Sequence, residues 1–170
     1  MTSIPSTDAF AIYDIRLVEP FERAIKHALE EIHKKSGDRH TADRVYEHLK
    51  TRVVTRYRNT ALYLAIDQRR VAEGRPMENS VVGFMTLDIG ENELAEPMTI
   101  ISRAWTEPGL GKDLWPIMKL WVWKWAKERN CETVQIQSER DSAFVHFLKH
   151  DGFKQYEVLL EARVNDGGSI

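Results

Sequence analysis

The sequence predicts a single domain of the α/β (α+β) class, with helices flanking a mixed central β-sheet. Apolar residues recur at helical spacing in some stretches and alternate in others, and the two kinds of stretch follow one another along the chain. The length of 170 residues suits one domain whose core needs no disulfide or metal. We expect a polar arm over residues 1–9, the folded domain over residues 10–164 and a tail over residues 165–170.

The composition argues against several kinds of partner. The formal net charge is −2, so no global field attracts nucleic acid or an anionic membrane. Cys131 is the single cysteine, which excludes an intrachain disulfide and favours a reducing compartment. No stretch approaches the ~20 apolar residues of a membrane span, and residues 1–8 lack the pattern of a signal peptide. We therefore expect a cytoplasmic protein with neither nucleic-acid nor membrane partners.

Periodicity and turn residues predict the elements in order. Strands are expected at residues 11–18, 62–66, 81–89, 98–105, 133–137 and 154–164. Helices are expected after Glu19-Pro20, after a Thr41 cap, from about residue 113 and after Ser138. Residues 68–80 are polar and contain glycine and proline, so they are expected to form a long exposed loop.

The helix that begins near residue 113 organises the second half of the chain. Pro116 is best tolerated in a first turn, and Asp113 is a suitable cap, so the helix is expected over about residues 114–129. Its apolar residues form one stripe, which consists of Leu114, Ile117, Met118, Trp121, Val122 and Trp125. Gly109 and Gly111 lie just upstream, where backbone N–H groups and the helix dipole would meet an anion.

The order strand, glycine turn, helix, strand, helix, Gly-Phe, strand resembles the core of the GCN5-related N-acetyltransferase (GNAT) superfamily. The residues that carry the resemblance are Gly109–Gly111, Trp125–Cys131 and Ala143–Phe153. The order of elements fits nearly the whole chain. The resemblance implies the GNAT fold, acetyl-CoA as cofactor, an amine acceptor and N-acetyltransferase activity.

In that family, a loop with the pattern Arg/Gln-x-x-Gly-x-Gly/Ala holds the pyrophosphate of acetyl-CoA. The resemblance places this role on Gly109, Leu110, Gly111 and Lys112. Thr106 stands where the family has Arg or Gln, and the Trp125-Ala126 pair comes roughly one turn later than usual. Counting back from that pair puts Trp115 at a glycine position, where an indole would crowd a pyrophosphate. The alternative is that the glycines form only a turn and that Lys112 is a solvated charge.

The catalytic groups are less well marked. The family's tyrosine acid falls on Leu148, which has no proton to donate, and Tyr156 is a substitute candidate further along the chain. For a general base the candidates are Asp88, Glu96 and Glu107, and no spacing selects among them.

His146 and His150 lie four residues apart, a spacing that can hold a metal ion. No third ligand is evident beside them in the sequence. We therefore expect two surface histidines and no metal.

Two functions from different classes follow. The first is an acyl-CoA-dependent N-acetyltransferase whose cofactor loop is degenerate. The second is a catalytically inactive GNAT-like structural or interaction protein, such as an internal virion or tail-associated component of a bacteriophage, with protein partners and a location within a virion. Two segments are similar to those phage proteins, namely Arg103–Trp105 and Ser142–Phe153.

Overall fold

Within the residues that the structure describes, the protein contains a mixed five-stranded sheet, which confirms the predicted fold class. The computed structural model describes residues 9–36, 40–136 and 148–153, and the chain divides into two compact units, residues 1–137 and 138–170. The sheet belongs to the first unit, and its strands follow the chain order β1-β2-β3-β4-β5. Its first four strands are antiparallel, and β4 and β5 are parallel. The strand bounds are β1 Phe10–Asp14, β2 Thr60–Asp67, β3 Val81–Glu91, β4 Pro97–Thr106 and β5 Thr133–Ile136.

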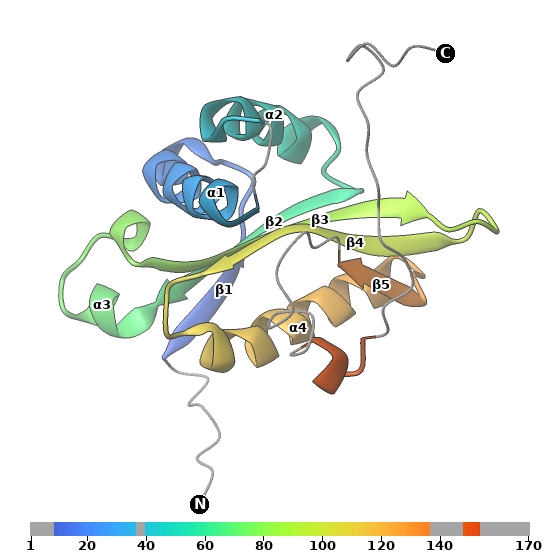
Figure 1. Ribbon diagram of the computed structural model, residues 1–170. Helices are drawn as coiled ribbons and strands as arrows, with labels where there is room; N and C mark the ends of the chain where they lie inside the picture. The colour runs from blue at the N-terminus through green and yellow to red at the C-terminus, as the bar shows by residue number, and fades with distance from the viewer. Residues whose placement is uncertain (1–8, 37–39, 137–147, 154–170) are drawn as a thin grey trace, which may run out of the picture. The chain divides into compact units, whose positions relative to one another are not determined.

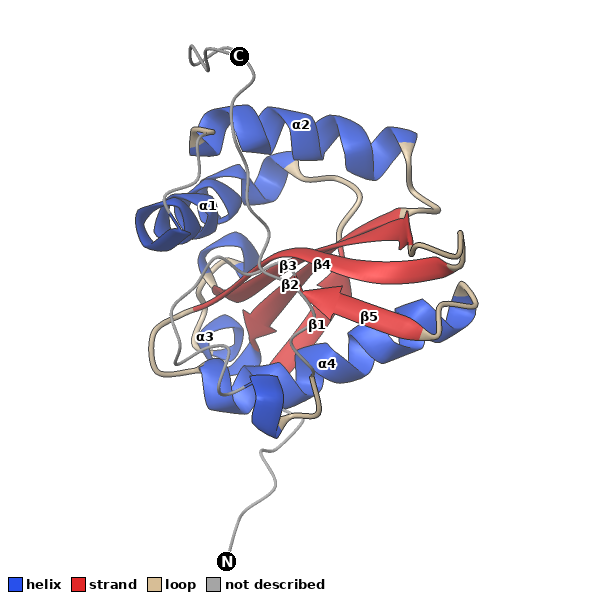
Figure 2. Ribbon diagram, turned by 45° about the vertical axis from the view of Figure 1, so that its right-hand side comes forward, coloured by secondary structure: helices blue, strands red, loops and turns tan. Residues whose placement is uncertain are grey.

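Helices cover both faces of this sheet. Helices α1 (Glu22–Ser36) and α2 (Ala42–Thr55) lie on one face, and α4 (Gly111–Glu128) lies on the other (Figures 1 and 2). As expected, the Thr41 hydroxyl caps α2 by accepting a hydrogen bond from the backbone N–H of Arg44 at 3.3 Å. Strand β2 is buried along its entire length because it lies between two strands and two helical layers.

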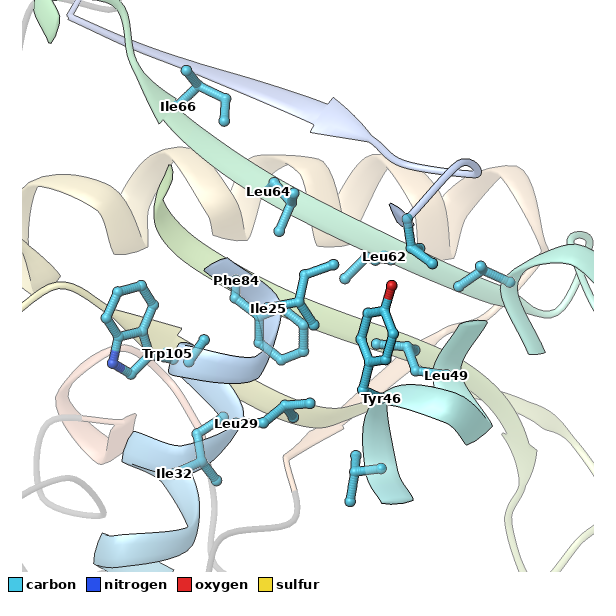
Figure 3. Packing of buried hydrophobic residues seen from close by; sticks show 14 residues of the cluster. Ile25, Leu29, Ile32, Tyr46, Leu49, Leu62, Leu64, Ile66, Phe84 and Trp105 are labelled. Carbon is cyan, nitrogen blue, oxygen red and sulfur yellow. The ribbon is translucent and has the colours of Figure 1, made fainter. Parts of the chain in front are cut away.

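The larger hydrophobic core lies between the sheet and the α1–α2 pair. Figure 3 shows side chains of α1 and α2 packed against alternate residues of β2, beside Phe84 of β3 and Trp105 of β4. The alternation follows from the strand period of two, which directs every second side chain to the same face. The residues of this core are Val18, Ile25, Ala28, Leu29, Ile32, Val45, Tyr46, Leu49, Val53, Leu62, Leu64, Ile66, Phe84 and Trp105.

Helix α4 begins earlier than the start predicted from placing Pro116 in its first turn. It starts at Gly111 after the N-cap residue Leu110, and Asp113 lies in its first turn without capping it. Pro116 is therefore inside the helix, where it lacks the N–H that would bond to the Lys112 carbonyl. The buried side chains of α4 are Leu114, Trp115, Met118, Val122, Trp125 and Ala126. The stripe is thus rotated from the predicted one, and Ile117 and Trp121 are only partly buried.

The segment predicted as a loop over residues 68–80 contains helical structure. Helix α3 spans Gln68–Ala72, and a 3₁₀ turn spans Met77–Asn79. Asp67 caps α3, because its carboxylate accepts a hydrogen bond from the backbone N–H of Arg69 at 3.0 Å. This local cap allows a short helix in a sequence without apolar periodicity.

Strand β1 also differs from its prediction, since it ends at Asp14 instead of continuing to residue 18. Beyond it, the Arg16 guanidinium donates hydrogen bonds to the carbonyls of Val53 at 3.3 Å and Thr60 at 2.8 Å. In the second unit, a helical turn at residues 148–150 is followed by Gly152, whose φ of 92° is the expected left-handed exit. Among the helices that the structure describes, none is long and apolar enough to cross a membrane.

Candidate functional site

A β-bulge in β4 lies where the described pairing with β5 ends. The parallel ladder joins Met98–Ile101 to β5, whereas β4 continues along β3 as far as Thr106. Thr86 of β3 pairs with Arg103 and Leu87 pairs with Ile101, so Ser102 is the extra residue of the bulge. Bulges redirect side chains and change the course of a strand. This bulge presents Ser102 and Arg103 to the face of the sheet that α2 covers.

The predicted glycine loop directly joins β4 to α4. Gly109 has a φ of +89°, a conformation that costs glycine little, and a Cβ there would meet no atom within 4 Å. At Gly111 a Cβ would lie 3.3 Å from the Thr106 hydroxyl oxygen, so a larger side chain would crowd the turn. The Leu110 N–H donates to the Glu107 carbonyl at 3.0 Å, which closes the turn. The loop is therefore open at its first glycine and tight at its second.

The N-terminus of α4 is uncapped. Leu110 makes no side-chain cap, and its carbonyl accepts the N–H groups of Asp113 at 3.1 Å and Leu114 at 2.9 Å. Within the part of the chain that the structure describes, no protein acceptor is recorded for the N–H groups of Gly111 and Lys112. Unbonded N–H groups and the positive end of the helix dipole favour an anion at this position.

Trp115 does not stand at the loop. It lies within α4, one turn after Gly111, and is only 7% exposed. The structure thus places Gly109 and Gly111 at the turn that follows β4, and Trp115 among the buried side chains of α4.

Glu107 is held in an ion pair beside this loop. Arg70 of α3 donates Nη1 to Glu107 Oε2 at 2.8 Å and Nη2 to Oε1 at 2.9 Å. The two parallel contacts tie α3 to the glycine loop. A carboxylate held in this way stabilises the loop and is poorly placed to accept a proton from a substrate.

Asp88 lies on β3, beside the bulge, and its oxygens are well occupied. Oδ1 accepts from Arg52 Nη2 at 2.5 Å and from the Thr60 hydroxyl at 3.0 Å. Oδ2 accepts from the Ser102 hydroxyl at 2.5 Å and from Arg52 Nη1 at 3.5 Å. A carboxylate offers about four lone-pair sites, so these four contacts use its capacity. Asp88 therefore orients Arg52, Thr60 and Ser102.

The remaining catalytic candidates lie elsewhere. Glu96 is exposed in the β3–β4 turn and accepts from Asn92 Nδ2 at 2.8 Å. At about 3.3 Å per strand residue, it is roughly 20 Å along the chain from Ser102. Tyr156 lies outside the described residues. Of the predicted candidates that the structure does describe, Asp88 is the one that lies beside the bulge.

A small cleft with polar walls surrounds Asp88. It lies between α2 and strands β2, β3 and β4, with a cavity volume of about 20 Å³. Thr86 is only 4% exposed, and its hydroxyl has no hydrogen-bond partner in the part of the chain that the structure describes. Sequence reasoning missed this cleft because its residues come from four separate elements and form no local motif. The lining residues are Val45, His48, Leu49, Arg52, Thr60, Thr86, Asp88, Ser102 and Arg103.

The histidine pair predicted to lie on the surface is only partly described. His150 falls in the described helical turn, and His146 lies outside the described residues. Over residues 9–36, 40–136 and 148–153, no group of three His, Cys, Asp or Glu side chains is arranged to hold a metal ion.

Comparison with solved structures identifies the fold. The chain is similar to glucosamine-6-phosphate N-acetyltransferase from Arabidopsis thaliana, with a TM-score of 0.64 and 10% identity over 92% of this chain and 99% of that chain. It is similar to aminoglycoside 6'-N-acetyltransferase AAC(6')-Ih from Acinetobacter baumannii, with a TM-score of 0.64 and 14% identity over 93% of this chain and 99% of that chain. A third neighbour is AAC(6')-Iy in complex with the bisubstrate analog CoA-S-monomethyl-acetylneamine. Its TM-score is 0.64, with 10% identity over 91% of this chain and 97% of that chain.

The fold is therefore that of the GNAT acetyltransferases, as the order of elements predicted. No family model matches the sequence, and no curated protein matches it either. At 10–14% identity these neighbours establish the architecture, while function has to be argued from the site.

Proposed function

We propose that this protein is an acyl-CoA-dependent N-acyltransferase that uses acetyl-CoA as donor and an amine as acceptor. The observation that carries the proposal is the glycine turn that leads from β4 into the uncapped N-terminus of α4. The GNAT fold of the neighbouring acetyltransferases supports it, as does the CoA-containing analog bound in one of them.

The loop residues fit the diphosphate of CoA. The N–H groups of Gly111 and Lys112 would donate hydrogen bonds to phosphate oxygens, and Gly109 and Leu110 would shape the turn. The exposed Lys112 ammonium would add a charge-assisted contact. Thr106 stands where the family has Arg or Gln, so the motif itself lacks that side chain. The ion pair with Glu107 holds the Arg70 guanidinium beside the loop, where it would supply a positive charge.

An acyl-CoA supplies a thioester. The amine nitrogen would attack its carbonyl carbon, the carbon–sulfur bond would break with its electron pair leaving on sulfur as thiolate, and the nitrogen would release one proton to solvent. Among the described side chains, Asp88 and Glu107 are engaged by arginines and Glu96 is remote from the bulge. The acceptor amine would therefore enter already neutral from solvent. Leu148 cannot protonate a leaving thiolate, but a thiol pKa of about 8.5 makes the thiolate a competent leaving group without an acid.

The test is thermal stabilisation by CoA and acetyl-CoA. Ligand at about 100 times its dissociation constant should add about 2.7 kcal/mol to the free energy of unfolding. For a domain of this size, that gain raises the melting temperature by roughly 5–11 °C. Gly111→Val should abolish the shift, since its side chain would press on the Thr106 hydroxyl and obstruct the helix N-terminus.

Lys112→Ala should reduce the same shift, because it removes one charged contact with the phosphates. The matched control is Lys127→Ala, which removes an exposed lysine from the last turn of the same helix and should leave the shift unchanged. A melting temperature that millimolar CoA and acetyl-CoA both leave unaltered would remove the enzyme proposal.

A second candidate is a non-catalytic binding protein on the GNAT fold. Leu148 favours it, because the family's proton donor is absent from that position. The comparisons lend no support to a phage virion component in particular. Absence of any thermal response to CoA would favour this second function.

A further inference from the structure

We propose that the cleft around Asp88 binds the anionic group of the acceptor, so that the substrate is an amine that also carries a carboxylate or a phosphate. The proposal rests on the acyl-transfer function proposed above, and it names the acceptor class for that reaction. Its evidence is independent of the glycine loop, because the cleft lies between α2 and strands β2 to β4.

The hydrogen-bonding groups in the cleft favour an anion. Its lining places the Arg52 guanidinium in an ion pair with the Asp88 carboxylate. The Asp88 carboxylate already accepts four hydrogen bonds, so it has no capacity left for the ammonium of a substrate. The Arg52 guanidinium has five N–H donors in total, and its side chain is 29% exposed, so it can contact a ligand while it holds Asp88.

Thr86 supplies a second, independent observation. Its hydroxyl is buried and has no hydrogen-bond partner among the described residues, although a buried hydroxyl without a partner is costly. It lines the same cleft as Arg52, where an oxygen of a carboxylate or phosphate would accept its proton. A cavity volume of about 20 Å³ holds little more than one water-sized group. The cleft would therefore admit an oxygen of the anionic group and anchor one end of the acceptor instead of enclosing the whole molecule.

The position of the cleft suits an acceptor anchor. Ser102 is both a wall of the cleft and the bulged residue of β4, where the described pairing with β5 ends. An acceptor held by its anionic group in the cleft would therefore lie alongside β4, the strand that leads into the glycine loop.

The experiment is a titration of the full chain followed by ¹H–¹⁵N NMR, without any acyl-CoA. The probes are β-alanine and phosphoethanolamine, and the matched amines without an anionic group are propylamine and ethanolamine. We expect the two anionic probes to shift the amide signals of Thr86, Ser102 and Arg103, and the two plain amines to leave them unchanged. Tighter binding of β-alanine would indicate that the cleft prefers a carboxylate, and tighter binding of phosphoethanolamine would indicate that it prefers a phosphate.

Thr86→Val removes the unpartnered hydroxyl with little change of shape and should weaken binding about tenfold or more. Thr99→Val is the matched control, because Thr99 is also buried, also has no hydrogen-bond partner among the described residues and does not line the cleft. Both variants replace a buried, unpartnered hydroxyl with an apolar group, so both should fold.

Binding of an anionic probe that Thr86→Val weakens and Thr99→Val preserves would support the proposal. No binding, equal binding of the plain amines, or equal effects of the two variants would overturn it. Because the titration contains no acyl-CoA, failure here is separate from failure of the thermal shift with CoA, which tests the acyl-transfer function itself.

Discussion

Replacing Asp88 with asparagine tests whether this carboxylate organises the centre of the candidate site. The substitution Asp88→Asn would keep the shape of the side chain but remove the negative charge opposite Arg52, and the new NH₂ group would face donors from Thr60 or Ser102. Removing one partner of a buried ion pair costs about 3–5 kcal/mol. The Asp88 and Arg52 side chains are 14% and 29% exposed, so solvent reduces the expected loss to about 2–3 kcal/mol.

Urea unfolding measures this loss, and thermal unfolding should show a decrease in melting temperature of roughly 4–12 °C. A double-mutant cycle with Arg52→Met should give a coupling energy of about 1 kcal/mol or more, because the two side chains share direct contacts. Arg44→Met is the control for loss of an arginine, since Arg44 is exposed on the same helix.

The same variant separates a structural role from a catalytic one. If Asp88 were the general base, Asp88→Asn would lower kcat while the urea midpoint stayed near that of the wild type. A change in unfolding free energy below about 0.5 kcal/mol, with no coupling to Arg52, would refute the argument that Asp88 holds its neighbours in place.

Two further predictions concern packing and charge. Gly83→Val should destabilise the fold by about 1–3 kcal/mol in urea unfolding, because the new Cβ would lie 2.9 Å from the Ala65 Cβ beneath α4; no loss would mean that α4 does not pack closely there. The hydrogen bond from Arg69 lowers the pKa of Asp67 in the folded state. The ionised Asp67 carboxylate therefore stabilises the fold fully at a pH above its unfolded pKa near 3.8, and this stabilisation is lost as the pH falls through the lower folded pKa. Asp67→Asn should therefore cost about 1–2 kcal/mol at pH 7 and progressively less below about pH 4; a cost independent of pH would contradict this.

Local patterns predicted most of the fold. The Thr41 cap, the alternation in β2 and β3 and the glycine turn before α4 all depend on neighbours in sequence. The predicted start of α4 is wrong for a local reason, since proline by itself favours a first turn. The structure tolerates Pro116 further inside the helix, where the burial of Leu114 and Trp115 offsets one missing hydrogen bond.

The arrangement of side chains in the site was beyond local reasoning. Asp88 is one of three equivalent candidates in the sequence, and only the folded chain brings it to Arg52 and Ser102. The bulge at Ser102 has no glycine or proline to announce it, and it arises from the register between β3 and β4. Contacts between residues 14 to 36 positions apart carry no periodic signal.

The proposed donor site and the proposed acceptor site depend on different parts of the chain, so the fold bears on the two proposals to different degrees. The glycine loop offers mainly backbone N–H groups, which depend on the turn and the helix more than on particular side chains. The cleft depends on Arg52, Thr86 and Asp88, whose side chains a shared fold does not dictate. Donor binding and acceptor recognition can therefore fail independently. If the chain bound CoA but did not bind an anionic amine, the proposed donor site would stand and the proposed acceptor class would be wrong.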